Sequence, residues 1–131
     1  MTERATGEFV LDGRDAVTFD DAEGATLGRV TAPKTFRGDL EGTSRAELLT
    51  VYDADGNPAA YVGVERVTGV LCGRSGTFVL HHTAPGTAGE PIVIRIVPNT
   101  ATGELAGLSG TFLITGDVEG GHTYAIDYDL P

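Results

Sequence analysis

The sequence has a single cysteine, Cys72, and no long hydrophobic run among its 131 residues. One cysteine excludes a disulfide within the chain. A membrane-spanning helix needs about 20 consecutive apolar residues, and no apolar stretch of this chain approaches that length. The opening segment Met1–Glu8 lacks the apolar region of a secretory signal. These absences predict a cytoplasmic protein that does not enter a membrane.

Basic residues are scarce as well. The chain has 9 lysines and arginines against 19 aspartates and glutamates, which gives a formal net charge of −10. The basic residues Arg29, Lys34 and Arg37 alternate with other residue types, a pattern typical of a solvated strand. Because a surface of this charge repels polyanions, the sequence predicts neither nucleic acid nor an anionic membrane as a partner.

Apolar residues with the period of a helix are missing too, whereas short β-branched and aromatic runs recur between Gly, Asp, Asn and Pro. The length fits one domain, residues 1–131 with a core of about 6–130. A short strand is also expected at Ala16–Phe19. The main predicted strands are Thr6–Leu11, Ala25–Phe36, Thr43–Tyr52, Ala60–Leu71, Arg74–Thr83, Pro91–Val97, Leu108–Thr115 and His122–Leu130.

The connections between these strands are short and carry turn residues. Asp53–Pro58 and the pair Cys72-Gly73 are predicted hairpin turns, and further turns are expected at residues 85–89, 98–103 and 116–121. Short links favour antiparallel pairing of consecutive strands, which predicts an all-β, eight-stranded, up-and-down antiparallel barrel.

Several predicted strands are apolar on both faces. Ile92–Val97, Phe78–Leu80 and Phe112–Ile114 each offer apolar side chains to both sides of the sheet. One side can fill the barrel, but the other needs a cover that this chain does not supply from helices. The pattern therefore predicts a homo-oligomer, a dimer or a trimer.

Five segments occur in an order that resembles a known family: Gly38–Gly42, Tyr61–Arg66, Gly73–Leu80, Gly103–Leu108 and Tyr124–Leu130. Together they are similar to the bacterial domain-of-unknown-function family 3224, over roughly the whole chain. The resemblance implies the barrel fold of the allene oxide cyclase superfamily, often in an oligomer. Cyclases of that superfamily hold a reactive, apolar substrate in one conformation, but a shared fold alone does not establish an activity.

Glu65 is the candidate for chemistry that the residues themselves single out. If Cys72-Gly73 is a two-residue loop, Glu65 lies opposite Leu80, and Gly63 lies opposite His82. Glu65 and His82 then share one face with Val67, Phe78 and Leu80. A carboxylate among apolar groups with a histidine nearby suits general acid–base catalysis. The alternative is a structural pair of Glu65 with His82, or with Arg66 or Arg74 as the counter-charge.

Glu47 is the third candidate catalytic residue. An odd-length loop at Asp53–Pro58 places Glu47 beside Glu65, where two carboxylates share a proton. An even-length loop places Ala46 opposite Glu65 and turns Glu47 to the other face, where it is solvated or salt-bridged.

The candidate ligand-binding residues are Tyr52, Tyr61, Arg74 and Phe78. The alternatives are that the tyrosines pack with a wet hydroxyl and that Arg74 bonds carbonyls of the adjacent turn. No metal site is predicted, because the neighbours His81 and His82 point to opposite faces of a strand, and no cofactor is predicted either. The sequence thus favours a barrel that binds a small apolar or amphipathic molecule, as a cyclase or isomerase, over a non-catalytic oligomeric domain.

Overall fold

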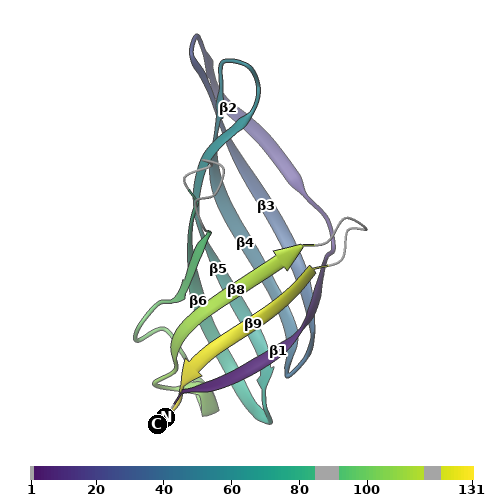
Figure 1. Cartoon of the computed structure of the whole chain (residues 1–131), viewed down its shortest axis with the longest axis vertical. Coiled ribbons are helices and arrows are strands. Elements are labelled where there is room, and N and C mark those ends of the chain that lie inside the picture. Colours follow the sequence, from purple (N-terminus) through teal and green to yellow (C-terminus); the bar gives the residue numbers. More distant parts are fainter. Residues whose placement is uncertain (1, 85–91, 117–121) are drawn as a thin grey trace.

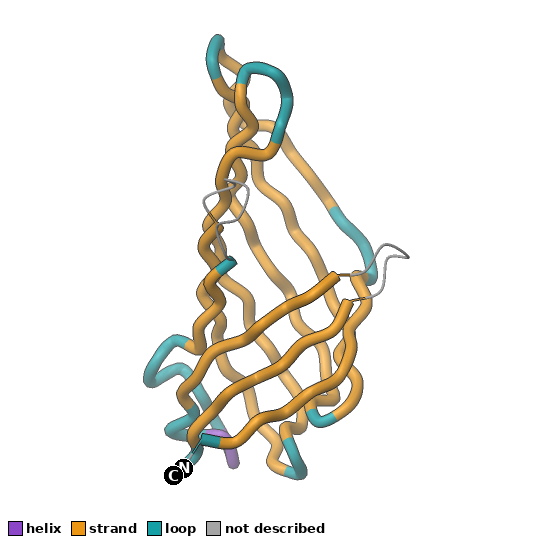
Figure 2. The backbone as a smooth tube through the Cα atoms, in the orientation of Figure 1, coloured by secondary structure: helices purple, strands orange, loops and turns teal. Residues whose placement is uncertain are grey.

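A computed structural model describes residues 2–84, 92–116 and 122–131 of the chain. It contains nine β-strands and a single turn of 3₁₀ helix in these residues (Figures 1 and 2). The strands are β1 (Glu3–Leu11), β2 (Asp15–Ala22), β3 (Ala25–Gly38), β4 (Leu40–Asp53), β5 (Pro58–Leu71), β6 (Arg74–Ala84), β7 (Val93–Ile96), β8 (Ser109–Gly116) and β9 (His122–Asp129). No helix of the described residues is long and apolar enough to span a membrane.

Eight of the strands close an antiparallel barrel, which confirms the predicted fold class. The sheet order is β1-β9-β8-β7-β6-β5-β4-β3-β2, and β1 also pairs with β3. This second pairing joins Gly7–Leu11 to Lys34–Gly38 and closes the barrel. The strand β2 lies outside that closure, because it pairs with the earlier part of β3, from Ala25 to Thr31.

The strands differ greatly in length, and this difference shapes the molecule. The long strands β3 to β6 rise well above the shorter β1, β8 and β9, so the upper part of the molecule is a curved sheet and the lower part a closed barrel (Figure 1). The two termini lie side by side at the lower end (Figure 1). Alternation along each strand sends one set of side chains into the barrel and the other set outward.

The closed lower part is filled by side chains. Rings of four of its residues, Phe36, Phe78, Phe112 and Tyr124, lie with their centroids 5.7 to 6.5 Å apart. Leu40, Leu71, Leu105 and Leu108 are almost fully buried nearer the lower end. Leu105 belongs to the 3₁₀ turn Gly103–Leu105, which is fastened to β6 by hydrogen bonds from Ser75 to Glu104.

The predicted hairpin at Cys72-Gly73 has the conformation its sequence favours. Both residues have positive φ, 48° at Cys72 and 85° at Gly73, as a two-residue type I′ loop requires. Leu71 therefore pairs with Arg74, Gly63 with His82 and Glu65 with Leu80, as predicted. Of the other expected turns, residues 85–89 and most of 116–121 lie outside the described residues, as does Pro91 at the start of the strand expected over Pro91–Val97.

Candidate functional site

Glu65 lies inside the barrel, near the middle of β5, and is only 1% exposed. Its neighbours across the sheet are Ala46 on β4 and Leu80 on β6. Two residues before it, Gly63 leaves space for β4, since a Cβ there would meet Leu48 Cδ2 and the Glu47 carbonyl. The glycine thus marks a close approach of strands, as its place within a strand predicts.

Three side chains from three other strands bind the Glu65 carboxylate. Lys34 Nζ on β3 lies 3.1 Å from Oε1, and His82 Nε2 on β6 lies 2.7 Å from the same oxygen. Ser44 Oγ on β4 donates to Oε2. All four side chains are buried, with Lys34 7% and His82 3% exposed. We call Lys34, Ser44, Glu65 and His82 the buried polar cluster.

The electrostatics of the cluster favour an ionised Glu65. Burial by itself raises the pKa of a carboxyl group, because it penalises the charged form. At Glu65 the hydrogen bond from His82, the positive charge of Lys34 and the hydrogen bond from Ser44 together outweigh burial and hold the pKa below its ordinary value. The carboxylate therefore accepts a hydrogen bond from each of these three side chains.

Lys34 has a different environment from the one expected of it. It does not belong to a solvated strand; it is buried, and it takes the counter-charge role considered for Arg66 or Arg74. Arg66 lies on the outer face, one residue from Glu65, and Arg74 is exposed beside the hairpin turn. The signal that identifies Lys34 is its period-two relation to the apolar residues Ala32 and Phe36, which shows that it faces the core.

Ser44 is the other member of the cluster that the sequence reasoning misses. It lies two residues before Ala46 on β4, so the two side chains share the inner face of the barrel. Serine is common on either face of a strand, and the residue type alone therefore gives no signal. Its role depends on the register of β4 and β5, which brings its hydroxyl to Glu65.

The two ring nitrogens of His82 differ in their hydrogen bonding. Because the ionised Glu65 can only accept, Nε2 of His82 carries the proton in their 2.7 Å hydrogen bond. Nδ1 makes no hydrogen bond to any of the described residues. A carboxylate that accepts from one imidazole nitrogen in this manner fixes the tautomer and the orientation of the ring.

Above the cluster the barrel holds a partly open cavity of about 220 Å³. We call this cavity the cup. His82 and Lys34 line it together with Arg14 and His122. Its remaining wall is mostly apolar: Phe9, Leu11, Val30, Ala32, Ala46, Leu48, Tyr61, Ile92, Ile94 and Ile114. The lumen is therefore packed below the buried polar cluster and hollow above it.

The predicted ligand-binding residues are divided between these regions. Tyr61 lines the cup, with its ring 6.3 Å from that of His82, and burial raises the pKa of its hydroxyl. Phe78 does not line the cup; it is fully buried in the core below, against Phe112. Arg74 lies at the other end of β6, far from the cup. Tyr52 does not line the cup either, although its hydroxyl lies 3.4 Å from Arg14, which does.

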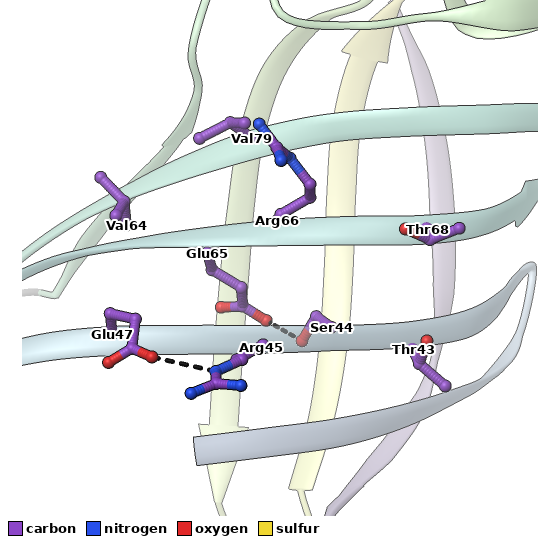
Figure 3. A pocket seen from close by; sticks show the side chains of 9 residues that line it. All are labelled: Thr43, Ser44, Arg45, Glu47, Val64, Glu65, Arg66, Thr68 and Val79. Carbon is purple, nitrogen blue, oxygen red and sulfur yellow. Dashed lines mark hydrogen bonds and ion pairs between the residues drawn. The ribbon is translucent and has the colours of Figure 1, made fainter. Parts of the chain in front are cut away.

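Glu47 does not join Glu65, and the prediction of a shared carboxylate site is wrong. Tyr52 pairs with Pro58 across an odd-length loop, but a bulge next to this pair shifts the register, so that Val51 pairs with Ala60. Ala46, not Glu47, therefore lies opposite Glu65. Glu47 points outward to Arg45, while Glu65 points to Ser44 (Figure 3). The pKa of Glu47 is lowered by hydrogen bonds from Thr31 and Arg45 and by the charge of Arg29. Burial raises it by less. This is the salt-bridged alternative considered from the sequence.

His81 is exposed and His82 is buried, as their adjacent places on a strand require. The part of the chain that the structure describes holds no group of three His, Cys, Asp or Glu side chains placed to bind a metal ion.

Comparison with known proteins places the chain in a family. Residues 5–128 match the family described as proteins of unknown function, DUF3224. The chain belongs to the DUF3224 family. A crystal structure of a DUF3224 protein of unknown function from Shewanella oneidensis MR-1 is similar to it, with a TM-score of 0.84 and 33% sequence identity. The match covers 100% of this chain and 99% of that one.

No curated protein matches the chain significantly. The family assignment confirms the resemblance carried by the five sequence segments, and the full coverage shows that the two DUF3224 barrels share their fold from end to end. The link to the allene oxide cyclase superfamily stays a prediction.

Proposed function

We propose that this DUF3224 protein binds a small amphipathic molecule in the cup. The observation that carries the proposal is the position of the cavity: about 220 Å³ of space lies directly above a buried, charged cluster inside a barrel that is otherwise tightly packed. Ligand sites are typically concave and mostly apolar, with a few polar groups that fix orientation. The cup has both properties.

The buried polar cluster gives the cup a polar floor. Burying a lysine and a glutamate is costly, and replacing a buried ion pair by apolar residues of similar volume often costs no stability. What an apolar pair cannot provide is hydrogen bonding to a ligand. Lys34 Nζ has three N–H donors, one of which serves Glu65. The floor therefore suits a carbonyl or hydroxyl group at the inner end of a ligand with an apolar body.

A proton-transfer reaction, as in an isomerase or cyclase, is the more specific form of this proposal. His82 supplies a base whose other nitrogen is held by Glu65, and Lys34 supplies a positive charge 3.1 Å from the same carboxylate oxygen. A base beside a cation is the arrangement that removes a proton next to a carbonyl and stabilises the oxyanion that forms. The resemblance to the allene oxide cyclase superfamily, whose cyclases hold an apolar substrate in one conformation, supports the binding of an apolar body in the cup.

The test of ligand binding is an NMR titration with 1-octanol, following the methyl signals of Val30, Ile94 and Ile114 in the cup. We expect these signals to shift in the unaltered protein and to stay in place in Ala46→Leu, which fills the cup. Ala125→Leu adds the same volume on the outer face of β9 and is the matched control. Shifts confined to outer-face methyls, or equal shifts in Ala46→Leu, would overturn the proposal.

A second candidate is assembly into a homo-oligomer through the outer face of β4 and β5. Leu49, Val62 and Val64 are 48 to 52% exposed, and Leu49 pairs directly with Val62. A shallow outer hollow of about 560 Å³ lies beside them, lined in part by Val64 and Val79 (Figure 3). Contiguous exposed apolar side chains of this kind mark interaction surfaces.

A further inference from the structure

Among the described residues that line the cup, all charged side chains are basic. Arg14 and Lys34 line it, accompanied by His82 and His122, and no aspartate or glutamate is among its described lining residues. This is the reverse of the whole protein, in which acidic residues outnumber basic ones by 19 to 9. The cup is therefore a local positive site in an acidic molecule.

No carboxylate among the described residues that line the cup balances the charge of Arg14. Glu65 is covered and neutralises Lys34. Arg14 follows β1 in the short connection to β2, and it donates a long hydrogen bond of 3.4 Å to Tyr52 Oη. Among the described residues it has no carboxylate within ion-pair distance, even though Asp12 and Asp15 are close in sequence; Asp12 accepts instead from Thr35 Oγ1 at 2.5 Å.

We infer that the ligand carries an anionic head group of the carboxylate type, bound by Arg14 at the mouth of the cup. The inference rests on the proposed function, since it names the class of molecule that the cup takes. A guanidinium binds a carboxylate through two parallel hydrogen bonds, which gives both affinity and orientation. The head group thus lies at Arg14, the apolar body extends between Val30 and Ile94, and the polar floor contacts a carbonyl or hydroxyl group at the inner end of the ligand.

The cavity volume limits the size of that ligand. A buried apolar cavity of about 150 Å³ accommodates benzene, so the 220 Å³ of the cup fits a body of roughly ten non-hydrogen atoms. A medium-chain or aryl carboxylic acid has this size. Octanoate, 1-octanol and octylamine form a matched set of probes with one apolar chain and three different head groups.

The experiment is isothermal titration of the three probes into the unaltered protein, Arg14→Gln and Arg37→Gln. Arg37 is exposed on the outer face of β3, so its replacement makes the same change in net charge away from the cup. We expect octanoate to bind about tenfold more tightly than octylamine, as one charge-assisted contact implies. Arg14→Gln should weaken the binding of octanoate about tenfold and leave the affinity for 1-octanol unchanged. Arg37→Gln should change neither affinity.

The outcomes separate this inference from the proposed function. Equal affinities for octanoate and 1-octanol, both unaffected by Arg14→Gln, would overturn the anionic head group and leave binding in the cup intact. If Arg14→Gln and Arg37→Gln weaken octanoate binding equally, the effect comes from net charge, and the role of Arg14 is overturned. Failure of all three probes to bind, together with no NMR shifts from 1-octanol, would overturn the proposed function itself.

Discussion

Glu65 holds the buried polar cluster together, because its carboxylate is the acceptor for Lys34, Ser44 and His82. Replacing it with glutamine leaves the Lys34 ammonium buried without a counter-charge. We expect Glu65→Gln to lower the free energy of unfolding by about 3–5 kcal/mol, measured by urea denaturation. Glu23→Gln, which makes the same charge change at an exposed turn, should alter it by less than about 0.5 kcal/mol.

A double-mutant cycle shows whether the loss comes from the ion pair. Adding Lys34→Met to Glu65→Gln removes the stranded charge, so the double variant should be more stable than Glu65→Gln alone. If the two substitutions add without interaction, Lys34 and Glu65 do not stabilise each other in the folded protein. In that case the members of the cluster act as independent polar residues.

The pH dependence of stability follows from the lowered pKa of Glu65. In the unfolded chain a glutamate has a pKa of about 4.3. Because the folded-state pKa is lower, the ionised carboxylate contributes stability above the unfolded value, and this contribution is lost as the pH falls through the folded pKa. The melting temperature of the unaltered protein should therefore fall more steeply below about pH 5 than that of Glu65→Gln. Parallel profiles, measured by circular dichroism from about pH 7 to 3, would contradict this.

The hairpin between β5 and β6 fixes the register that brings Glu65 and His82 together. Gly73 has a φ of 85°, where a side chain costs about 1–2 kcal/mol. Gly73→Ala should lower the free energy of unfolding by about 1 kcal/mol. Gly13→Ala is the control: Gly13 has no positive φ, and a Cβ there makes only an ordinary contact with Pro33. A gain or no change at Gly13 with a loss at Gly73, measured by thermal unfolding, is the expected result.

Elements of this fold differ in how far the sequence determines their pairing. The two-residue loop at Cys72-Gly73 allows one register, so the turn residues alone predict that Glu65 and His82 are neighbours. The longer connection around Asp53–Pro58 allows odd and even registers, and a bulge between Val51 and Tyr52 adds an irregularity. The position of Glu47 depends on that choice, which the residues alone leave open.

Lys34 shows a different limit of sequence reasoning among the strands. Its alternation with Ala32 and Phe36 indicates a core-facing side chain, but the charge of lysine favours a solvated one. The curvature of the closed barrel decides between them, because it brings Lys34 on β3 within reach of Glu65 across the intervening β4. Contacts between strands that are not neighbours depend on how all the strand pairings together close the barrel.

The hollow upper part of the barrel is a property of the whole molecule. The aromatic rings of the lower part come from β3, β6, β8 and β9, and none of these strands by itself indicates where the filling ends. The cup is lined by residues of the long strands, such as Val30 and Leu48, together with Phe9, Ile114 and His122 of the shorter ones. Whether a barrel is filled or hollow depends on the summed volume of side chains from all strands, so the cup follows from the fold and not from a motif.

Assembly is also a property of the whole molecule, and substitutions on the outer face of β4 and β5 test it. We expect the unaltered protein to sediment with at least twice the mass of one chain. The double substitution Val62→Asp and Val64→Asp should convert it to a monomer, because it places charges in the exposed apolar patch. Leu113→Asp, on the outer face of β8 and 59% exposed, is the control for adding a charge at an exposed apolar residue of another strand.

The comparison between these variants locates the interface. If Leu113→Asp dissociates the oligomer and the β5 variant does not, the interface lies on β8 and the assignment to β4 and β5 is wrong. A monomeric unaltered protein at every concentration would remove assembly as a function and leave binding in the cup as the remaining candidate. Because Val62 and Val64 point away from the lumen, their substitution should leave 1-octanol binding unchanged. Binding lost together with assembly would indicate that the cup is complete only in the oligomer.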